Sequence, residues 1–320
     1  MSMKTEYSAM LEQEIKATIS YAPDLAGLYD PIVYGLDTGG KRLRPMLALM
    51  AASACGATPD EAMPAALAVE MFHNFTLLHD DVMDSSPTRR GKPSIWRKWD
   101  VNTAILSGDT LFALCYKQIM RLPDSALAPA LRMFTDSAVQ VMEGQQLDMD
   151  FENRDDVSLS EYLEMIRLKT SVLLGCATAL GAIAAGADES SVKAFYTYGE
   201  ALGIAFQIQD DFLDVYGDPS TFGKPIGGDI LNAKKTFLLL SAREGGQAQA
   251  LRRAMQLPPD GTRIAAVRDV YDKAGIPTLC QEAITRYTDR ALEALKAIDM
   301  PDNAREELAG LALGLADRKK

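Results

Sequence analysis

The stretch LLHDDVMDSSPTRRG, residues 77–91, joins an apolar segment to two clusters of opposite charge. Its two leucines run into three carboxylates, Asp80, Asp81 and Asp84, and a pair of arginines follows. Upstream, apolar residues recur at three- and four-residue spacing through Pro64–Met83, which predicts a helix that ends in the aspartates. Carboxylates this close repel one another, so the pattern indicates that a polyvalent ligand binds between the acidic and the basic groups.

The aspartate pattern recurs later in the chain as Asp210, Asp211 and Asp214, again at the end of an apolar helical segment. Residues four apart share a helix face, so Asp80 lines up with Asp84, and Asp210 with Asp214. Mg²⁺ binds oxygen ligands and is often held by a few carboxylates together with the phosphate oxygens of a substrate. Two such clusters facing each other therefore predict a clamp for a magnesium-bound diphosphate.

The residues alone leave two other interpretations of the aspartates open. A solvated helix end would explain one acidic cluster, although a matched second copy is harder to explain in this way. A di-metal centre of the ferritin type would need Glu-x-x-His pairs. The chain has two histidines, His73 and His79, and Glu70-x-x-His73 is the single match to that spacing. The magnesium clamp is therefore the preferred interpretation.

Helical patterns dominate the chain, and no run of alternating β-branched residues bounded by turns predicts a sheet. The apolar periodicity predicts helices at Tyr7–Ile19, Arg44–Ala54, Pro64–Met83, Thr103–Met120, Ala126–Gln146, Ser160–Ala187, Ser190–Tyr216 and Thr278–Ala297. The motifs ATPDEA and SLSEY have the capping residues of helix starts. No low-complexity linker divides the 320 residues, 48% of which are hydrophobic. The sequence predicts an all-α fold, a single large helical bundle over residues 1–320.

Composition limits the classes of partner and compartment. The net charge of −11 argues against general binding of nucleic acid or of anionic membranes. Four cysteines lie far apart without a CxxC pair, which fits a reducing, cytoplasmic location. The N-terminus carries charges where a signal peptide would be apolar. The longest uncharged stretch, residues 171–187, is rich in small residues and predicts a buried helix rather than a stable membrane insertion.

Basic residues are clustered despite the acidic composition. GGKRLRP, residues 39–45, places Lys41, Arg42 and Arg44 behind a glycine pair and just before a helix, where an anion is favoured. RRGK, residues 89–92, repeats the arrangement beside the first aspartates. Further cations are Lys169, Lys224, Lys234 and Lys235. Together with the paired aspartates, these groups predict two subsites for anions.

These motifs resemble the trans-isoprenyl diphosphate synthases, also called polyprenyl synthetases, over nearly the whole chain. The markers are GGKRLRP, HNFTLLHDDVMDSSPTRRGKPS, GDTLF, EGQQLDMDFE, RLKTS, FQIQDDFLDVYGD and FGKPIGGDI. The resemblance implies helices around a deep central cavity, a homodimer and a requirement for Mg²⁺. It implies the head-to-tail condensation of isopentenyl diphosphate with an allylic diphosphate, which releases pyrophosphate.

The resemblance also assigns roles to individual residues. It implies that the metal ligands are Asp80, Asp81, Asp84, Asp210, Asp211 and Asp214. It implies that Arg89, Lys169 and Lys224 contact the allylic diphosphate, with Lys234 nearby, and that isopentenyl diphosphate is held by Lys41, Arg44, His73 and Arg90. The residues lining the reacting region would be Gln145, Thr170 and Gln207. The chain ends in ADRKK, and the sequence leaves open whether this basic tail reaches the site.

The helix before Asp80 bears on product length. Thr76 lies roughly 6 Å, Phe75 about 7.5 Å and Phe72 roughly 12 Å below Asp80 along the helix axis. In the family, the growing prenyl chain extends into a tunnel, and a bulky residue four or five positions before the first aspartate forms the floor of that tunnel. Phe75 and the small Thr76 therefore predict a short product, geranylgeranyl first and farnesyl second. A class I terpene cyclase and a non-catalytic regulatory subunit of the same fold are the alternative functions.

Overall fold

The helix that carries the first aspartates, α4 (Pro59–Met83), begins at a capping box. The Thr58 side chain and Glu61 cap each other's backbone N–H groups, and Pro59 occupies the first turn. A second capping box, between Ser158 and Glu161, begins α8 (Leu159–Ile166). Both helix starts are those that the sequence predicts from ATPDEA and SLSEY. The structure is a computed structural model, and it describes residues 3–18, 23–218 and 226–318.

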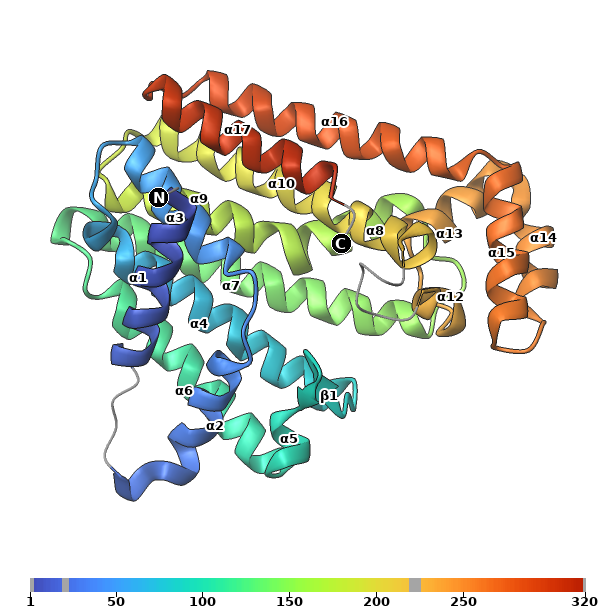
Figure 1. Cartoon of the computed structure of the whole chain (residues 1–320), viewed down its shortest axis with the longest axis horizontal. Coiled ribbons are helices and arrows are strands. Elements are labelled where there is room, and N and C mark those ends of the chain that lie inside the picture. Colours follow the sequence, from blue (N-terminus) through green and yellow to red (C-terminus); the bar gives the residue numbers. More distant parts are fainter. Residues whose placement is uncertain (1–2, 19–22, 219–225, 319–320) are drawn as a thin grey trace. The chain divides into compact units, whose positions relative to one another are not determined.

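The described residues form two compact units, of which the first comprises residues 1–135 and 176–193. Its complete helices are α1 (Met3–Thr18), η1 (Pro23–Leu25), α2 (Ala26–Asp37), α3 (Leu43–Ala54), α4, α5 (Ile95–Lys98) and α6 (Val101–Ile119). α4 packs against α3 and α6 (Figure 1), and its middle turns are buried on all sides. This burial explains why α4 is mostly apolar before it reaches the aspartates, with Glu70, His73 and Asn74 as polar exceptions.

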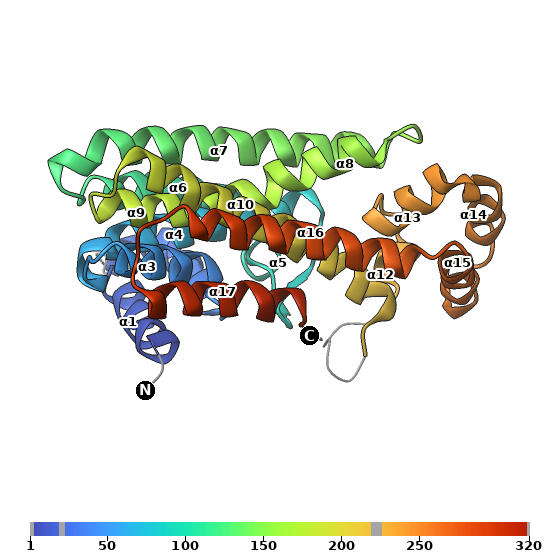
Figure 2. The same cartoon turned by 90° about the horizontal axis from the view of Figure 1, so that it is seen from above.

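The second unit comprises residues 136–175 and 194–320. Its complete elements are α8, η2 (Arg167–Ser171), α12 (Gly228–Leu231), α13 (Phe237–Ala242), η3 (Arg243–Gln247), α14 (Ala248–Met255), α15 (Gly261–Lys273), α16 (Ile276–Lys296) and α17 (Asp302–Ala316). α16 and α17 lie side by side (Figure 2). The division between the units falls within α7 (Asp124–Glu152), α9 (Val172–Ala184) and α10 (Glu189–Tyr216).

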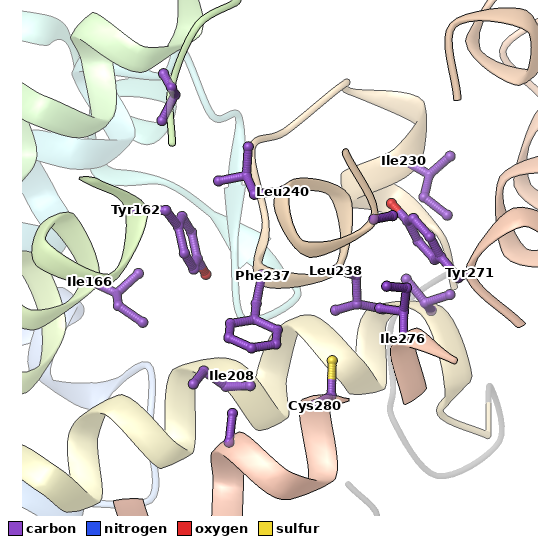
Figure 3. Close-up of a cluster of buried hydrophobic side chains, with 14 of the residues drawn as sticks. Tyr162, Ile166, Ile208, Ile230, Phe237, Leu238, Leu240, Tyr271, Ile276 and Cys280 are labelled. Atoms are coloured by element: carbon purple, nitrogen blue, oxygen red, sulfur yellow. The ribbon is translucent and has the colours of Figure 1, made fainter. Parts of the chain in front are cut away.

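A hydrophobic cluster forms the core of the second unit. Figure 3 shows Tyr162 and Ile166 of α8, Ile208 of α10, Phe237 of α13 and Cys280 of α16 gathered in it. The side chains of all five residues are at most 4% exposed. Because Ile208 precedes the second aspartate cluster by two residues, this core fixes the helix segment that carries those carboxylates.

The all-α prediction is confirmed. In the described part of the chain, the β structure consists of one hairpin with two strands of two residues each, β1 (Thr88–Arg89) and β2 (Lys92–Pro93). The prediction of a single domain over residues 1–320 stays a prediction, because the two units are described separately. Among the described residues, the continuous helical segment Leu159–Ala184, which comprises α8, η2 and α9, is long and apolar enough to cross a membrane, but 83% of its apolar stretch is buried inside the structure. This burial is the property of a core helix.

Candidate functional site

The first aspartate cluster lies at the C-terminal end of α4, in the first unit. Asp80 is half-buried one turn from the end, and Asp84 is the exposed C-cap, whose N–H donates to the Asp80 carbonyl across 2.8 Å. The carbonyl groups at a helix C-terminus carry partial negative charge, which favours a cation beside them. Two carboxylates on one face of this end therefore form a suitable position for a divalent metal ion.

Asp81 has a different environment from its two neighbours. Its side chain is buried, and its Oδ1 accepts hydrogen bonds from Nε and Nη2 of Arg89, at 2.9 and 2.5 Å. Burial raises the pKa of Asp81, and the hydrogen bonds and charge of Arg89 act in the opposite direction. Asp81 therefore holds the Arg89 guanidinium beside the cluster, in addition to the metal-binding role that the sequence predicts for it.

The β1–β2 hairpin presents the arginine pair. Its two turn residues, Arg90 and Gly91, both have positive φ, 52° and 76°, which is the backbone pattern of a type I′ turn. The Arg90 guanidinium packs against Gly40, where an added Cβ would lie 2.9 Å from Nη1. A hydrogen bond fixes the segment just before the hairpin, since Trp96 Nε1 donates to the Ser86 carbonyl at 2.9 Å. The hairpin thus meets the glycine pair of the GGKRLRP segment, as expected for one basic subsite.

Arg44 and His73 add two more of the predicted residues to this subsite. Arg44 Nη1 lies 3.4 Å from His73 Nε2. Burial lowers the pKa of His73 well below its usual value, and the charge of Arg44 lowers it further. The neutral ring accepts the Arg44 hydrogen bond through Nε2, so its Nδ1 carries the proton. Burial also lowers the pKa of Arg44, to about 10, and Arg44 Nε is buried without a hydrogen-bond partner among the described residues.

The structure does not support a di-metal centre at Glu70-x-x-His73. The Glu70 carboxylate accepts hydrogen bonds from Arg42 and from Asn74 Nδ2, the latter at 3.1 Å. His73 is paired with Arg44 instead. Across the described residues, no three Asp, Glu, His or Cys side chains are gathered so that they could hold a metal ion by themselves. The aspartates fit a metal that takes its remaining ligands from phosphate and water.

The second aspartate cluster lies near the C-terminal end of α10, in the second unit. Asp210 is half-buried, and its Oδ1 pairs with the guanidinium of Arg318. Arg318 also lies over the Phe206 ring, 4.2 Å from its centroid, and its carbonyl accepts from Gln209 Nε2 at 2.9 Å. Arg318, the basic residue that precedes the two lysines of the C-terminal ADRKK segment, therefore reaches the second cluster, which answers for this residue a question that the sequence leaves open.

Asp211 is buried and accepts hydrogen bonds through both oxygens. Oδ2 accepts from the Tyr162 hydroxyl and from the Phe237 N–H, the latter at 2.9 Å, and Oδ1 accepts from Gln207 Nε2 at 3.3 Å. Burial raises the pKa of Asp211 to about 7, and the three donors act in the opposite direction. These bonds position the last turns of α10 against α8 and α13. Tyr162 ends the SLSEY helix start, but that motif does not mark it as a partner of an aspartate.

Asp214, the third aspartate of the second cluster, contacts Asp229. Asp214 Oδ2 accepts from the Asp229 N–H at 3.0 Å, at the start of α12. Burial and the charge of Asp229 raise the pKa of Asp214, whereas the charge of Lys234 lowers it. Lys234 is therefore close enough to act on Asp214, and its place near the allylic diphosphate stays a prediction. Asp229 is a further acidic residue that its place in FGKPIGGDI could have indicated.

A π-helical turn, η2, presents two of the predicted residues in the second unit. π-helical turns are rare and frequently occur at functional sites. Lys169 Nζ donates to Asp148 Oδ2 at 2.5 Å, and Thr170 Oγ1 donates to Gln207 Oε1 at 3.4 Å. No local pattern marks Asp148 as a partner of Lys169, because their pairing depends on the contact between α7 and η2.

Three predicted substrate-site residues remain to be placed, and the first of them, Lys41, is exposed just before α3. Gln145 Oε1 is buried without a hydrogen-bond partner in the described ranges, one residue after Gly144, which packs against the backbone of Lys169. An unpartnered buried acceptor of this kind fits a site that receives a donor from a ligand. Lys224 lies outside the described residues.

The predicted floor residues lie in an aromatic cluster of the first unit. The Phe75 ring stacks on Phe112 of α6, with centroids 5.2 Å apart, and lies 5.4 Å from the Phe72 ring. Phe72 is fully buried, whereas Thr76 is half-buried and donates its hydroxyl to the His73 carbonyl at 2.8 Å. Phe75 is therefore supported from a second helix.

Comparison with known proteins gives consistent matches. The sequence model of the polyprenyl synthetase family matches residues 26–274. The chain is 36% identical to the short chain isoprenyl diphosphate synthase of Methanothermobacter thermautotrophicus, over 100% of this chain and 98% of that protein. Its structure is similar to a crystal structure of a geranylgeranyl pyrophosphate synthase, with a TM-score of 0.94, 44% identity and 100% of both chains covered. It is also similar to a polyprenyl synthase from Caulobacter crescentus complexed with calcium and isoprenyl diphosphate, with a TM-score of 0.85, 30% identity, and 99% and 96% of the chains covered.

Proposed function

The chain belongs to the polyprenyl synthetase family and is a short-chain trans-prenyltransferase, and we propose that it is a magnesium-dependent, cytoplasmic enzyme that makes geranylgeranyl diphosphate. Farnesyl diphosphate is the second candidate product. The observation that carries the proposal is the presence of both aspartate clusters, each near the C-terminal end of a helix, together with a gathered basic subsite. A non-catalytic subunit would have no reason to keep all of these groups.

We propose that the aspartates hold Mg²⁺ against the allylic diphosphate. The aspartates of both clusters are the candidate ligands, and several of them also contact protein groups: Asp81 and Asp211 accept hydrogen bonds, and Asp210 pairs with Arg318. The bound metal would supply charge stabilisation to the departing pyrophosphate. The Caulobacter polyprenyl synthase complex with calcium and isoprenyl diphosphate supports the use of a divalent cation.

The basic residues would divide the two substrates between them. Arg89 and Lys169 neutralise the allylic diphosphate as the C–O bond at its C1 breaks and an allylic carbocation forms. Lys41, Arg44 and Arg90 hold isopentenyl diphosphate, with His73 as a neutral donor through Nδ1. The isopentenyl double bond attacks the carbocation, and a proton then passes to the released pyrophosphate. This second basic subsite distinguishes a condensing enzyme from a terpene cyclase, which has one diphosphate substrate.

We also propose that the chain forms a homodimer. α6 presents three large apolar side chains, Val101, Ile105 and Leu106, which are 44%, 42% and 57% exposed. A row of such residues on one helix is typical of a surface that another protein covers. Sedimentation at several protein concentrations tests this state, and Leu106→Glu should shift the protein towards the monomer.

The test of the function is chromatography of the products formed from labelled isopentenyl diphosphate with dimethylallyl, geranyl or farnesyl diphosphate as primer. We expect a C20 prenyl diphosphate as the final product, and no turnover after the metal is removed with EDTA. Asp80→Ala and Asp210→Ala should each reduce kcat by orders of magnitude and leave the helical circular dichroism unchanged. Asp136→Ala, which removes an exposed carboxylate of α7, is the matched control. Formation of a hydrocarbon from farnesyl diphosphate alone would support a cyclase.

A further inference from the structure

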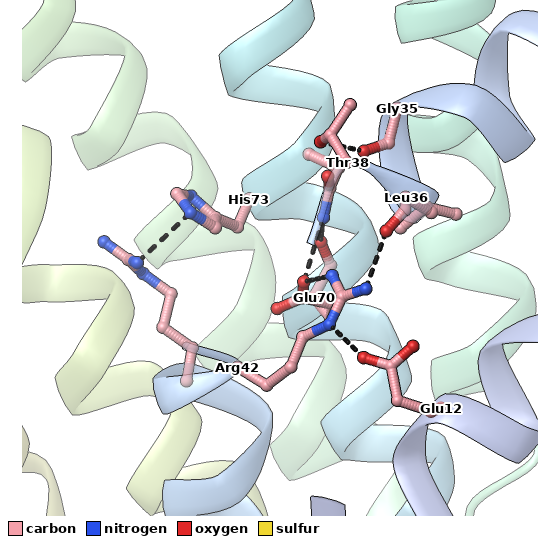
Figure 4. Close-up of polar contacts among 9 residues, drawn as sticks. Glu12, Gly35, Leu36, Thr38, Arg42, Glu70 and His73 are labelled. Atoms are coloured by element: carbon pink, nitrogen blue, oxygen red, sulfur yellow. Dashed lines mark hydrogen bonds and ion pairs between the residues drawn. The ribbon is translucent and has the colours of Figure 1, made fainter. Parts of the chain in front are cut away.

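Arg42 is buried in the middle of the GGKRLRP segment. Its side chain is directed at protein acceptors: Nε donates to Glu12 at 2.8 Å, Nη1 to Glu70 at 2.5 Å, and Nη2 to the Leu36 carbonyl at 2.6 Å (Figure 4). Only 5% of the residue is exposed. Each of its three guanidinium nitrogens donates a hydrogen bond to the protein. Arg42 therefore has no free pair of N–H donors with which to bind a diphosphate.

The backbone of Arg42 is in the left-handed region, with φ 46° and ψ 33°, at the N-cap of α3. This conformation costs a non-glycine residue on the order of 1 kcal/mol, so the surrounding contacts must hold it. The guanidinium contacts connect this turn to α1, α2 and α4 at once. Lys41 precedes the turn and Arg44 follows it, so the directions of both side chains depend on it.

Glu70 supplies the buried negative charge of this network. It is 3% exposed, and its Oε1 accepts from Arg42 and from Asn74, which is 1% exposed. Its charge also acts on Arg44 and Arg90, because it opposes the lowering of both pKa values by burial. Glu70 is therefore a carboxylate to which three arginines are attracted, and it is bonded to one of them.

We propose that the Arg42–Glu70 ion pair is a positioning device for isopentenyl diphosphate: Arg42 occupies Glu70 and thereby leaves Arg44 and Arg90 directed at the diphosphate. Arg42 is a positioning residue and not a ligand of the substrate. This inference rests on the proposed function, because it concerns the second basic subsite of that reaction.

Removing one partner of a buried ion pair leaves the other charge uncompensated, which is far more harmful than removing both. Without Arg42, the Glu70 carboxylate would take Arg44 or Arg90 as its new partner. The guanidinium that moved would no longer face the substrate. Removing the charge of Glu70 as well would abolish this competition. The proposal therefore predicts a rescue that a direct ligand could not give.

The experiment compares Arg42→Met, Glu70→Gln and the double variant with the wild type. Arg42→Met should raise the KM and the calorimetric Kd for isopentenyl diphosphate roughly tenfold or more. The KM for the allylic substrate and kcat at saturation should stay within about threefold of wild type. In the double variant, the KM for isopentenyl diphosphate should return to within about threefold of wild type, since the amide oxygen that Glu70→Gln introduces can still accept from Asn74.

Two comparisons make the result specific. Lys41→Met, which removes a proposed direct ligand, should weaken binding of isopentenyl diphosphate whether or not Glu70→Gln is also present. Glu6→Gln, which changes an exposed acid of α1, should leave all constants unchanged. If Arg42→Met does not fold, Arg42→Lys is the substitute, because it keeps the charge but not the planar guanidinium. It should raise the KM for isopentenyl diphosphate by a smaller factor and leave kcat nearly unchanged.

The proposal would be overturned if Arg42→Met weakened both substrates equally, or if Glu70→Gln gave no rescue in the double variant. The first result would mean that the network supports only the fold of the unit. The second would mean that Arg42 binds the substrate directly. A wild-type protein that binds neither substrate would instead refute the proposed function, so the two failures are distinguishable.

Discussion

Gly144 of α7 lies directly against the backbone of Lys169 in the π-helical turn. A Cβ at position 144 would come within 2.3 Å of the Lys169 nitrogen and 2.7 Å of the Leu168 carbonyl carbon. Because these atoms belong to backbone, they cannot move aside as a flexible side chain would. The close approach of α7 therefore fixes where η2 presents Lys169 and Thr170.

We expect Gly144→Ala to displace this turn and to reduce kcat/KM for the allylic substrate on the order of 10²-fold, because small misplacements of reacting groups are that costly. Steady-state kinetics with geranyl diphosphate as the varied substrate measures the effect. The matched control is Gly310→Ala in α17, where an added Cβ meets no atom within 4 Å. Equal kinetics in both variants would show that the π-helical turn tolerates displacement.

Phe75→Ala should lengthen the products. The substitution removes a ring that is 8% exposed and stacked on Phe112, so a prenyl chain could extend past this position. The variant should also lose roughly 3–5 kcal/mol of stability, as usual for a buried Phe→Ala change. Chromatography of the products at saturating isopentenyl diphosphate provides the measurement. Leu78→Ala, on the same helix but packed towards Gly35, should leave the product length unchanged.

His73 should remain neutral well below pH 6.5, since burial and then Arg44 lower its pKa. The unfolded chain binds a proton at this residue below pH 6.5 and the folded protein does not, so this residue reduces stability as the pH falls. The chain has two histidines, which makes NMR of the imidazole protons decisive, with His79→Gln to assign the signals. Adding isopentenyl diphosphate should raise the pKa of His73. A titration of His73 near pH 6.5 in the free protein would contradict its placement.

Asp211 should make folding stability depend on pH in the opposite direction. Its pKa is raised from 3.8 to about 7, so the unfolded chain releases this proton first as the pH rises. The contribution of Asp211 should therefore reduce the free energy of unfolding between pH 4 and 7, by up to about 4 kcal/mol. Urea unfolding in EDTA across this range should show that Asp211→Asn gains stability relative to wild type as the pH rises. If the difference in the free energy of unfolding between Asp211→Asn and wild type did not change with pH, Asp211 would be ionised across the whole range.

Much of the helical fold could be predicted because apolar periodicity marks helices with one buried face. The core helices α3, α4, α6 and α10 lie where the pattern places them, within a few residues. α2 could not be predicted in this way, since Gly27, Pro31 and Gly35 interrupt its pattern. α17 could not be predicted either, because charges fill its first turns and its burial depends on α16.

In the candidate site as well, local motifs could be predicted from the sequence, whereas contacts between distant segments could not. Its aspartates and basic clusters form motifs that are visible in the sequence. The partners that hold them, Asp148, Tyr162 and Arg318, come from distant segments, and the stretches EGQQLDMDFE, SLSEY and ADRKK in which they stand do not show what they contact. Pairings of this kind depend on which helices pack together, and no local periodicity encodes them.

The position of the aromatic residues in and just after α5 has a practical consequence. The chain has two tryptophans, and both follow the arginine hairpin closely: Trp96 is bonded to Ser86, and Trp99 packs against Tyr34 under the Lys98 ammonium group. All intrinsic indole fluorescence therefore originates beside Arg89 and Arg90. Titration with either diphosphate substrate should change the tryptophan emission without any attached dye. Binding of a substrate at the arginine hairpin can therefore be followed by fluorescence in the unmodified protein.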